Sequence, residues 1–106
     1  MMNDFTDLVQ DELDVIADII DQKCEEVAEA EFQGDVLTIT LSDGKQFVLN
    51  RNIVHRQLWL SSPFSGAWHF SYDDVQKRWV STRGTEKLHE ILSAEFSEIT
   101  GRAVSF

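Results

Sequence analysis

The spacing of apolar residues changes from three or four to two near residue 27, and this change sets the order of elements that the chain can form. Before that point, one apolar stripe recurs at helical spacing, which predicts a helix from about Asp4 to about Cys24. From Val27 onward, apolar and polar residues alternate, as they do along half-buried strands. The members of the helical stripe are Phe5, Leu8, Val9, Leu13, Ile16 and Ile20.

Short alternating segments, separated by turn residues, predict six strands. We expect Trp68 and Trp79, which fall in the last two of them, to pack in the core or against the sheet. The stretch between the third and fourth strands is expected to be irregular, and a loop should separate the fourth from the fifth. The strands are placed at residues 27–32, 37–41, 46–50, 57–61, 68–72 and 78–81.

A second helix is expected to follow the strands. Thr85 is a candidate cap, apolar residues recur at helical spacing from Leu88, and Gly101 stands where a helix commonly ends. The tail should pack back through Val104 and Phe106. Short connections favour an antiparallel sheet, and two amphipathic helices would cover one face of it. The sequence therefore predicts one α+β domain over residues 1–106, a two-layer sandwich with two helices packed on one face of a six-stranded antiparallel sheet.

Acidic residues are concentrated near the start of the chain and are regularly spaced. Nineteen acids and nine bases give a net charge of −10, and twelve of those acids lie in residues 1–36 with a single base. On the predicted first helix they recur every three or four residues, where each like-charged pair costs roughly 0.2–0.5 kcal/mol. Such a stripe indicates a cation or a basic protein surface as its partner. We define the acidic ridge as Asp11, Asp14, Asp18, Asp21, Glu25, Glu29 and Glu31.

The ligand types in the acidic ridge suit hard cations such as iron, manganese, calcium or magnesium, because carboxylate oxygens are present without cysteine or paired histidine. All seven acids are therefore candidate metal ligands, and exposed carboxylates of this kind are expected to bind weakly and exchange quickly. His69 is the best candidate for an auxiliary ligand. For the helix taken alone, a solvated acidic face without a ligand is the alternative interpretation.

Several classes of function are disfavoured by composition. The acidic balance argues against binding of nucleic acid, which needs a basic patch. A single cysteine, Cys24, excludes an internal disulfide and a cysteine-rich zinc site, and it is expected to be a packing residue at the helix end. No apolar run approaches the ~18 residues of a membrane span. The first residues carry acids where a targeting peptide would carry lysine or arginine, so we expect a cytoplasmic protein. No catalytic arrangement appears, so the chain is not expected to be an enzyme.

The alternation in the fourth predicted strand identifies a second candidate surface. If Leu58 and Leu60 face the helices, then Gln57, Trp59 and Ser61 face the open side of the sheet. An exposed tryptophan among polar groups is typical of a contact site. The residues expected to bind a partner are Asp18, Asp21, Glu25, Asn50, Gln57, Trp59 and Ser61.

The run QLWLSSPFSG at residues 57–66, preceded by Asn50 and Arg51, resembles the signature of the frataxin family. The acidic first helix, the VLTITL strand and Trp79 are similar to that family as well, and the resemblance runs through nearly the whole chain in order. It implies a helix–sheet–helix sandwich that binds iron (Fe²⁺ or Fe³⁺) weakly through the acidic ridge. It also implies contact with the cysteine desulfurase of the iron–sulfur cluster machinery, and the bacterial form is similar to a desulfurase regulator modulated by iron.

Three hypotheses follow, in order of preference. In the first, the acidic ridge docks on a basic surface of the desulfurase and Trp59 adds contacts from the sheet, with the iron–sulfur scaffold protein as a further partner. In the second, the same carboxylates make the chain an iron chaperone or ferroxidase. In the third, the chain is a generic acidic mimic that blocks basic proteins. The protein is expected to be mostly monomeric, with iron-dependent oligomers as a second form.

Overall fold

The first helix begins at an acidic cap and buries one stripe, as its sequence predicts. The computed structural model describes residues 4–106, and in it helix α1 spans Phe5–Lys23. The side chain of Asp4 accepts a hydrogen bond from the backbone N–H of Asp7 at 2.9 Å, which satisfies one of the free donors at the helix start. The apolar stripe is buried against the sheet, except for Leu8 at its margin, which is half-buried. The buried members are Phe5, Val9, Leu13, Ile16 and Ile20.

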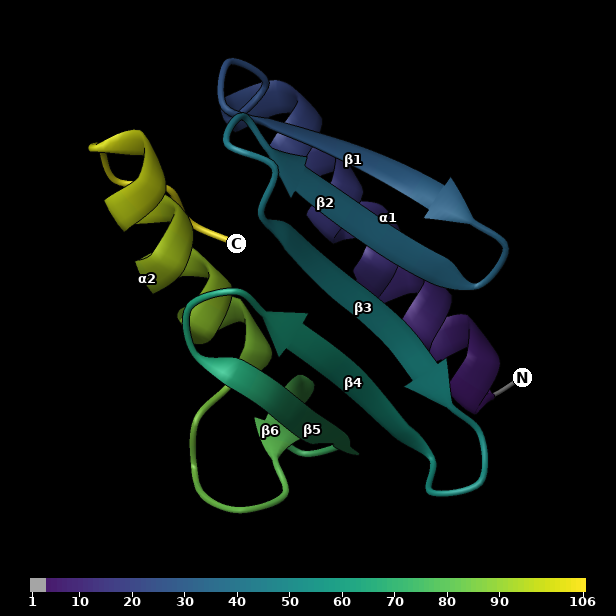
Figure 1. Ribbon diagram of the computed structural model, residues 1–106. Coiled ribbons are helices and arrows are strands. Elements are labelled where there is room, and N and C mark those ends of the chain that lie inside the picture. Colours follow the sequence, from purple (N-terminus) through teal and green to yellow (C-terminus); the bar gives the residue numbers. More distant parts are fainter. Residues whose placement is uncertain (1–3) are drawn as a thin grey trace.

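The strands form a single sheet in chain order. Every neighbouring pair is antiparallel, and both helices lie on the same face (Figure 1), so the predicted α+β sandwich is confirmed. No helix within residues 4–106 is long and apolar enough to cross a membrane. The strands are β1 (Ala28–Gln33), β2 (Val36–Leu41), β3 (Gln46–Asn52), β4 (Gln57–Ser62), β5 (Gly66–Asp73) and β6 (Arg78–Ser81), followed by helix α2 (Leu88–Thr100).

Aromatic rings join the sheet to the second helix and the tail. The ring of Phe47 on β3 lies 4.8 Å from that of Phe96 on α2, and Phe96 lies 5.4 Å from Phe106. The tail is held as well by Val104, which is buried and whose N–H donates to the Ser97 hydroxyl at 2.9 Å. The predicted return of the tail is therefore confirmed. Trp79 is buried and Trp68 is half-buried against the core, as expected.

Helix α2 begins later than predicted. Thr85 is exposed and does not cap the helix. The carbonyl oxygen of Glu86 accepts a hydrogen bond from the N–H of Ser81 at 2.8 Å, so Glu86 pairs with β6 and is not part of the helix. Lys87 also bridges to Val80, so this segment continues the pairing of β6 and the helix starts at Leu88. Gly101 ends the helix with φ of 72°, a left-handed conformation that glycine adopts without steric cost.

Four strands are longer than their sequence suggests. Strand β2 begins one residue earlier, at Val36, which pairs with Gln33 and Asn50. Strand β3 continues to Asn52, where Arg51 and Asn52 were expected to be irregular, because both residues pair with the start of β4. Strand β4 reaches Ser62 and β5 begins at Gly66, which pair with each other and leave only residues 63–65 as the turn. Polar residues continue a strand here because the neighbouring strand supplies their backbone partners.

Candidate functional site

The helical part of the acidic ridge runs along the solvent side of α1. Its four aspartates are exposed, because the helix turns its opposite, apolar stripe to the sheet. Asp14 accepts a hydrogen bond from the side-chain amide of Gln10 at 2.9 Å. In the part of the chain that the structure describes, none of the seven ridge carboxylates takes part in an ion pair. The ridge therefore presents uncompensated negative charge.

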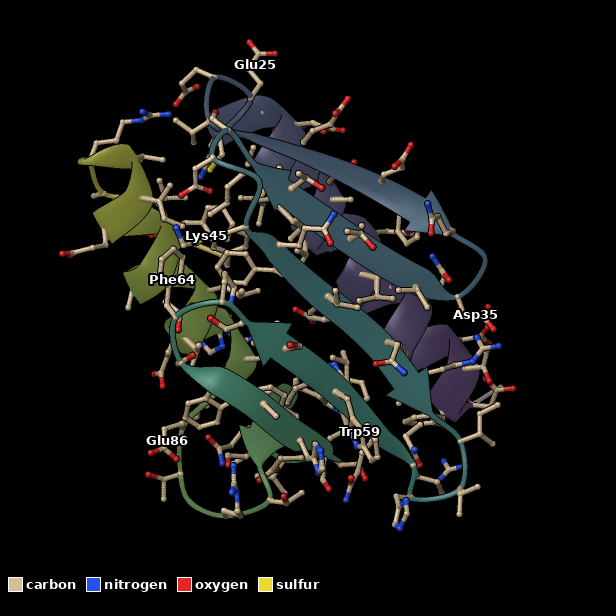
Figure 2. All side chains as sticks on the ribbon, in the orientation of Figure 1. Glu25, Asp35, Lys45, Trp59, Phe64 and Glu86 are labelled. Carbon is tan, nitrogen blue, oxygen red and sulfur yellow. The ribbon has the colours of Figure 1, made fainter. Side chains whose placement is uncertain are left out.

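The strand part of the ridge faces the other side of the sheet. Glu29 lies opposite Thr40 and Glu31 opposite Thr38, and these threonines alternate with the buried residues of β2. Both glutamates therefore point to the open face. Strand β1 is an edge strand that packs on α1, and Glu25 lies in the turn between the two (Figure 2). The ridge thus wraps around one edge of the sandwich, from the helix layer to the open sheet face.

The ridge is a line of carboxylates and not a closed cage. Over residues 4–106, no group of three or more His, Cys, Asp or Glu side chains is arranged to hold a metal ion. The donor atoms suit a hard cation, but water would have to complete its coordination. At the end of the ridge, Arg102 binds Glu26, and this hydrogen bond is the main reason why the pKa of Glu26 lies below its usual value.

Trp59 lies on the open face, as predicted, but it is half-buried and not fully exposed. Its ring stacks on His69 of β5, with centroids 4.0 Å apart and planes 10° from parallel. Its indole N–H donates to the Gln57 side-chain oxygen at 2.8 Å. Asn50 is its register partner on β3 and completes the row. His69 therefore supports the tryptophan from the side, and the indole is held in one orientation.

The strand part of the ridge and the Trp59 surface belong to one continuous face. Strands β2 and β3 separate Trp59 from β1, and three strand spacings make about 14 Å across the sheet. Gln33 is the β1 residue in the row of Trp59, so Glu31 lies one row further along and about 16 Å away. The side chains of Thr38, Val48 and Ser61 lie in the adjoining cross-strand row. None of them is large, so a flat partner surface can touch the strand part of the ridge and the tryptophan together. A typical interface of about 800 Å² per partner would span this distance.

The loop after Trp59 is tied to α2 by a network that the sequence did not indicate. The hydroxyls of Ser62 and Ser65 donate to the two carboxylate oxygens of Glu95, each at 2.6 Å. The indole N–H of Trp68 donates in turn to the Ser65 hydroxyl at 2.9 Å. We call these four residues the loop clamp. The serines of the QLWLSSPFSG run therefore hold the β4–β5 turn in place, directly beyond the strand that carries Trp59.

Comparison with known proteins places the chain in a family. The family model described as a frataxin-like domain matches residues 1–102, nearly the whole chain. The chain belongs to the frataxin family. The resemblance seen in the sequence is thus confirmed.

Similar frataxins come from bacteria and eukaryotes. The iron-sulfur cluster assembly protein CyaY of Stutzerimonas stutzeri is 34% identical over 98% of this chain and 90% of its own length. The mitochondrial frataxins of Dictyostelium discoideum and Schizosaccharomyces pombe are 35% and 36% identical, and the chain spans 53% and 65% of their lengths. A solved trimeric frataxin from Saccharomyces cerevisiae, complexed with ferrous iron, is 27% identical, with a TM-score of 0.79 over 96% of this chain and 90% of that one.

Cys24 is a packing residue in this frataxin, as expected. It is fully buried at the C-terminal end of α1, where its N–H donates to the Ile20 carbonyl at 2.9 Å. Burial raises the pKa of its thiol, and the negative charge of Glu26 raises it further. The thiol is therefore a poor nucleophile at neutral pH.

Replacing Glu95 with alanine is expected to lower the free energy of unfolding by about 2–3 kcal/mol, because two hydrogen bonds to a carboxylate are lost and Ser62 is buried. Chemical unfolding followed by circular dichroism measures the change. Glu98→Ala, three residues further along the helix, is the control, since Glu98 is exposed and should change stability by less than about 0.5 kcal/mol. Equal effects of the two variants would contradict the loop clamp.

Proposed function

We propose that this frataxin is an iron-binding regulator of iron–sulfur cluster assembly, and not itself an enzyme. It binds the cysteine desulfurase through the acidic ridge and through the face around Trp59. The observation that carries the proposal is the unpaired ridge, whose strand part shares one continuous face with a fixed indole ring. The bacterial relatives named iron-sulfur cluster assembly protein CyaY support the pathway. The chain acts in the cytoplasm, mostly as a monomer, and iron drives it into oligomers.

Each part of the surface has a separate task in this proposal. Unpaired carboxylates attract a basic surface over a distance and raise the association rate, an effect that salt screens. The indole then supplies the apolar contact that fixes the docked orientation, because tryptophans are common among residues that dominate binding energy. Asn50, Gln57 and Ser61 lie around the indole and supply polar contacts at its rim.

Iron would occupy the same carboxylates and act as the modulator. Since no three ridge groups converge, a bound ion would keep most of its water and would exchange rapidly. A cation on the ridge also neutralises charge that the desulfurase needs. Iron and the basic partner are therefore expected to compete for the ridge.

The decisive experiment is an amide NMR titration of the labelled protein with purified cysteine desulfurase in the absence of iron. Resonances of residues 11–31 and those around Trp59 are expected to broaden together at physiological salt. If only iron perturbs the ridge and the desulfurase leaves both regions unchanged, the regulator proposal fails. The second candidate function would then take its place.

That second candidate is an iron chaperone or ferroxidase that delivers iron to the cluster scaffold protein. The yeast frataxin that is complexed with ferrous iron favours it. It requires iron stoichiometry to follow the number of ridge carboxylates. The ferroxidase version further requires oxygen consumption faster than that of the same iron without protein.

Replacing Trp59 with alanine is expected to weaken desulfurase binding by about tenfold, the usual cost of losing one well-packed aromatic contact. Trp59→Phe is the matched control, since it keeps a ring against His69 but loses the N–H that Gln57 accepts. It should bind with intermediate affinity. Calorimetric titration gives both affinities, and a thermal unfolding curve shows that each variant is folded. Unchanged affinity of Trp59→Ala would remove the sheet face from the proposed interface.

A further inference from the structure

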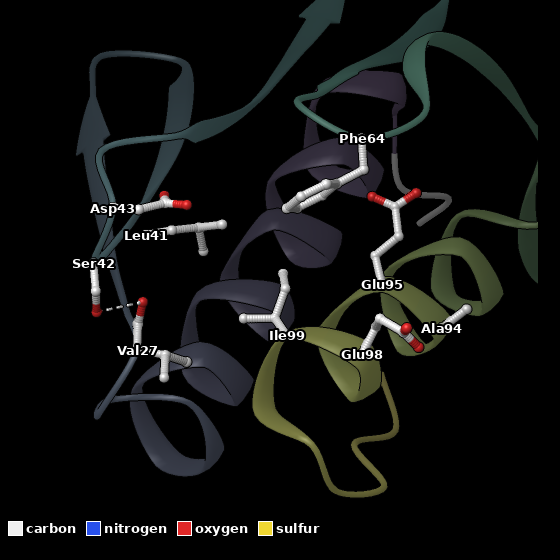
Figure 3. Close-up of a pocket in the computed structure, with 9 residues that line it drawn as sticks. All are labelled: Val27, Leu41, Ser42, Asp43, Phe64, Ala94, Glu95, Glu98 and Ile99. Atoms are coloured by element: carbon white, nitrogen blue, oxygen red, sulfur yellow. Dashed lines mark hydrogen bonds between the residues drawn. The ribbon is translucent and has the colours of Figure 1, made fainter.

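An apolar groove of about 610 Å³ lies between α2 and the end of the β2–β3 hairpin. Figure 3 shows Leu41, Phe64 and Ile99 pointing into the space between these elements. Phe64 is 53% exposed although its ring is large and apolar. Ala94 is also exposed and lines the groove from α2. The volume lies within the roughly 300–1,000 Å³ that is usual for binding pockets.

The groove is held open by the fold. Helix α2 turns Leu88, Leu92 and Phe96 to the core and leaves its Ala94 side facing the groove. The loop clamp ties the turn that carries Phe64 to this same helix, because Ser62 and Ser65 bind Glu95. The apolar wall therefore stays partly exposed to solvent.

A second pocket, of about 500 Å³, adjoins the groove, and Val27, Leu41 and Ser42 line both. Four acids line this second pocket: Asp21, Glu25, Glu26 and Glu29. Glu26 is occupied by Arg102, and the other three belong to the unpaired acidic ridge. An exposed apolar cavity and a cluster of negative charge are thus neighbours with one shared wall.

We propose that the groove anchors a basic segment of a partner protein. A large apolar or aromatic side chain of the segment enters the groove, while an arginine or lysine next to it reaches Asp21, Glu25 and Glu29. The charge of the rim decides this occupant, because the charged residues that line the groove within residues 4–106 are all acidic: Asp43, Glu95 and Glu98. Lys45 pairs with Asp43 at 2.9 Å, so Glu95 and Glu98 are the rim carboxylates without an ion pair there. This inference rests on the proposed function, since it specifies how the partner of the ridge is held.

A second copy of the chain is a poor occupant of the groove. Each copy has a net charge of −10, and the acids are concentrated around the site itself. Two copies would repel one another at this face. A segment that combines an apolar anchor with positive charge satisfies both pockets at once, and tryptophan and arginine are enriched among the residues that dominate binding energy at interfaces.

The test uses three peptides with blocked ends and the labelled full-length protein. The probe is RRWRR, the anchor control is RRGRR, and the charge control is QQWQQ. Amide NMR titration is expected to show shifts at Leu41, Phe64 and Ile99 together with shifts at Asp21 and Glu25 for the probe. The anchor control should shift only the ridge, and the charge control should bind at least about tenfold more weakly than the probe, as expected if the two pockets act together.

Variants of the groove separate it from the ridge. Ala94→Trp fills the groove from α2 and should weaken binding of RRWRR by about tenfold, while RRGRR binds as before. Ala103→Trp is the matched control, because Ala103 is exposed and does not line the groove, and it should change neither affinity. Phe64→Ala removes one apolar wall of the groove and should also weaken binding of RRWRR.

The proposal is overturned if Ala94→Trp binds RRWRR as tightly as the unmodified protein does, or if QQWQQ binds as tightly as RRWRR. Concentration-dependent shifts at the groove without any peptide would also overturn it, because a second copy would then be the occupant. The outcome for the proposed function is independent. If the ridge binds desulfurase and the groove binds no anchored peptide, only the further inference fails.

Discussion

The double variant Asp18→Lys, Asp21→Lys is expected to bind the cysteine desulfurase at least about a hundredfold more weakly than the unmodified protein. Both aspartates lie near the middle of the exposed ridge and take part in no ion pair within residues 4–106. Reversing them replaces two attractions by two like-charge contacts with a basic surface. The remaining affinity should depend little on salt, because the interaction that salt screens has been removed.

The control for this variant is Glu86→Lys, Glu90→Lys, which changes the net charge by the same amount on a surface away from the ridge. Both control residues are exposed, one before α2 and one in its first turn. Calorimetric titration at two salt concentrations should show near-normal affinity for the control. If both variants lose affinity equally, net charge alone explains the binding. If the ridge variant retains its affinity, the proposed interface is wrong.

Replacing Phe47 with alanine is expected to lower the free energy of unfolding by about 3–5 kcal/mol, because a large, fully buried ring is lost and a cavity remains. The Phe47 ring lies 4.8 Å from Phe96 and 6.0 Å from Phe64, so it connects the sheet, α2 and the β4–β5 turn. A typical domain is stable by only about 5–15 kcal/mol, so the variant should approach the limit of folding. Urea unfolding followed by circular dichroism measures the loss.

Val48→Ala is the matched control for this second prediction. Val48 is the next residue on β3 and is half-buried on the open face, opposite Ser61. Its truncation should cost less than about 1.5 kcal/mol, since it leaves no cavity in the core. A loss for Phe47→Ala as small as that for Val48→Ala would contradict the assignment of Phe47 to the centre of the core.

Periodicity alone determined much of this protein. The helical spacing from Phe5 to Ile20 and the acids opposite it predicted both faces of α1, because 3.6 residues per turn place residues three or four apart on one side. Alternation around Trp59 predicted which face of β4 it occupies for the same kind of reason. Short connections predicted the antiparallel sheet. All of these are local relations, and a local relation can be read from one segment.

The parts that sequence could not predict depend on how distant segments meet. Glu95 lies 33 residues from Ser62 and 30 from Ser65, and only the tilt of α2 over the sheet brings their side chains together. The predicted start of α2 was wrong because the carbonyl oxygen of Glu86 accepts a hydrogen bond from Ser81 of β6. Helix propensity does not include such a bond to a distant strand.

The candidate surfaces of this protein divide in the same way. Spacing along the chain determined that the ridge exists, and tertiary packing decided that it wraps the β1 edge, that His69 holds the indole of Trp59, and that a groove opens beside Phe64. The physical reason is that charge and apolar periodicity are encoded within one element. Register, tilt and cavity shape arise only when several elements pack together.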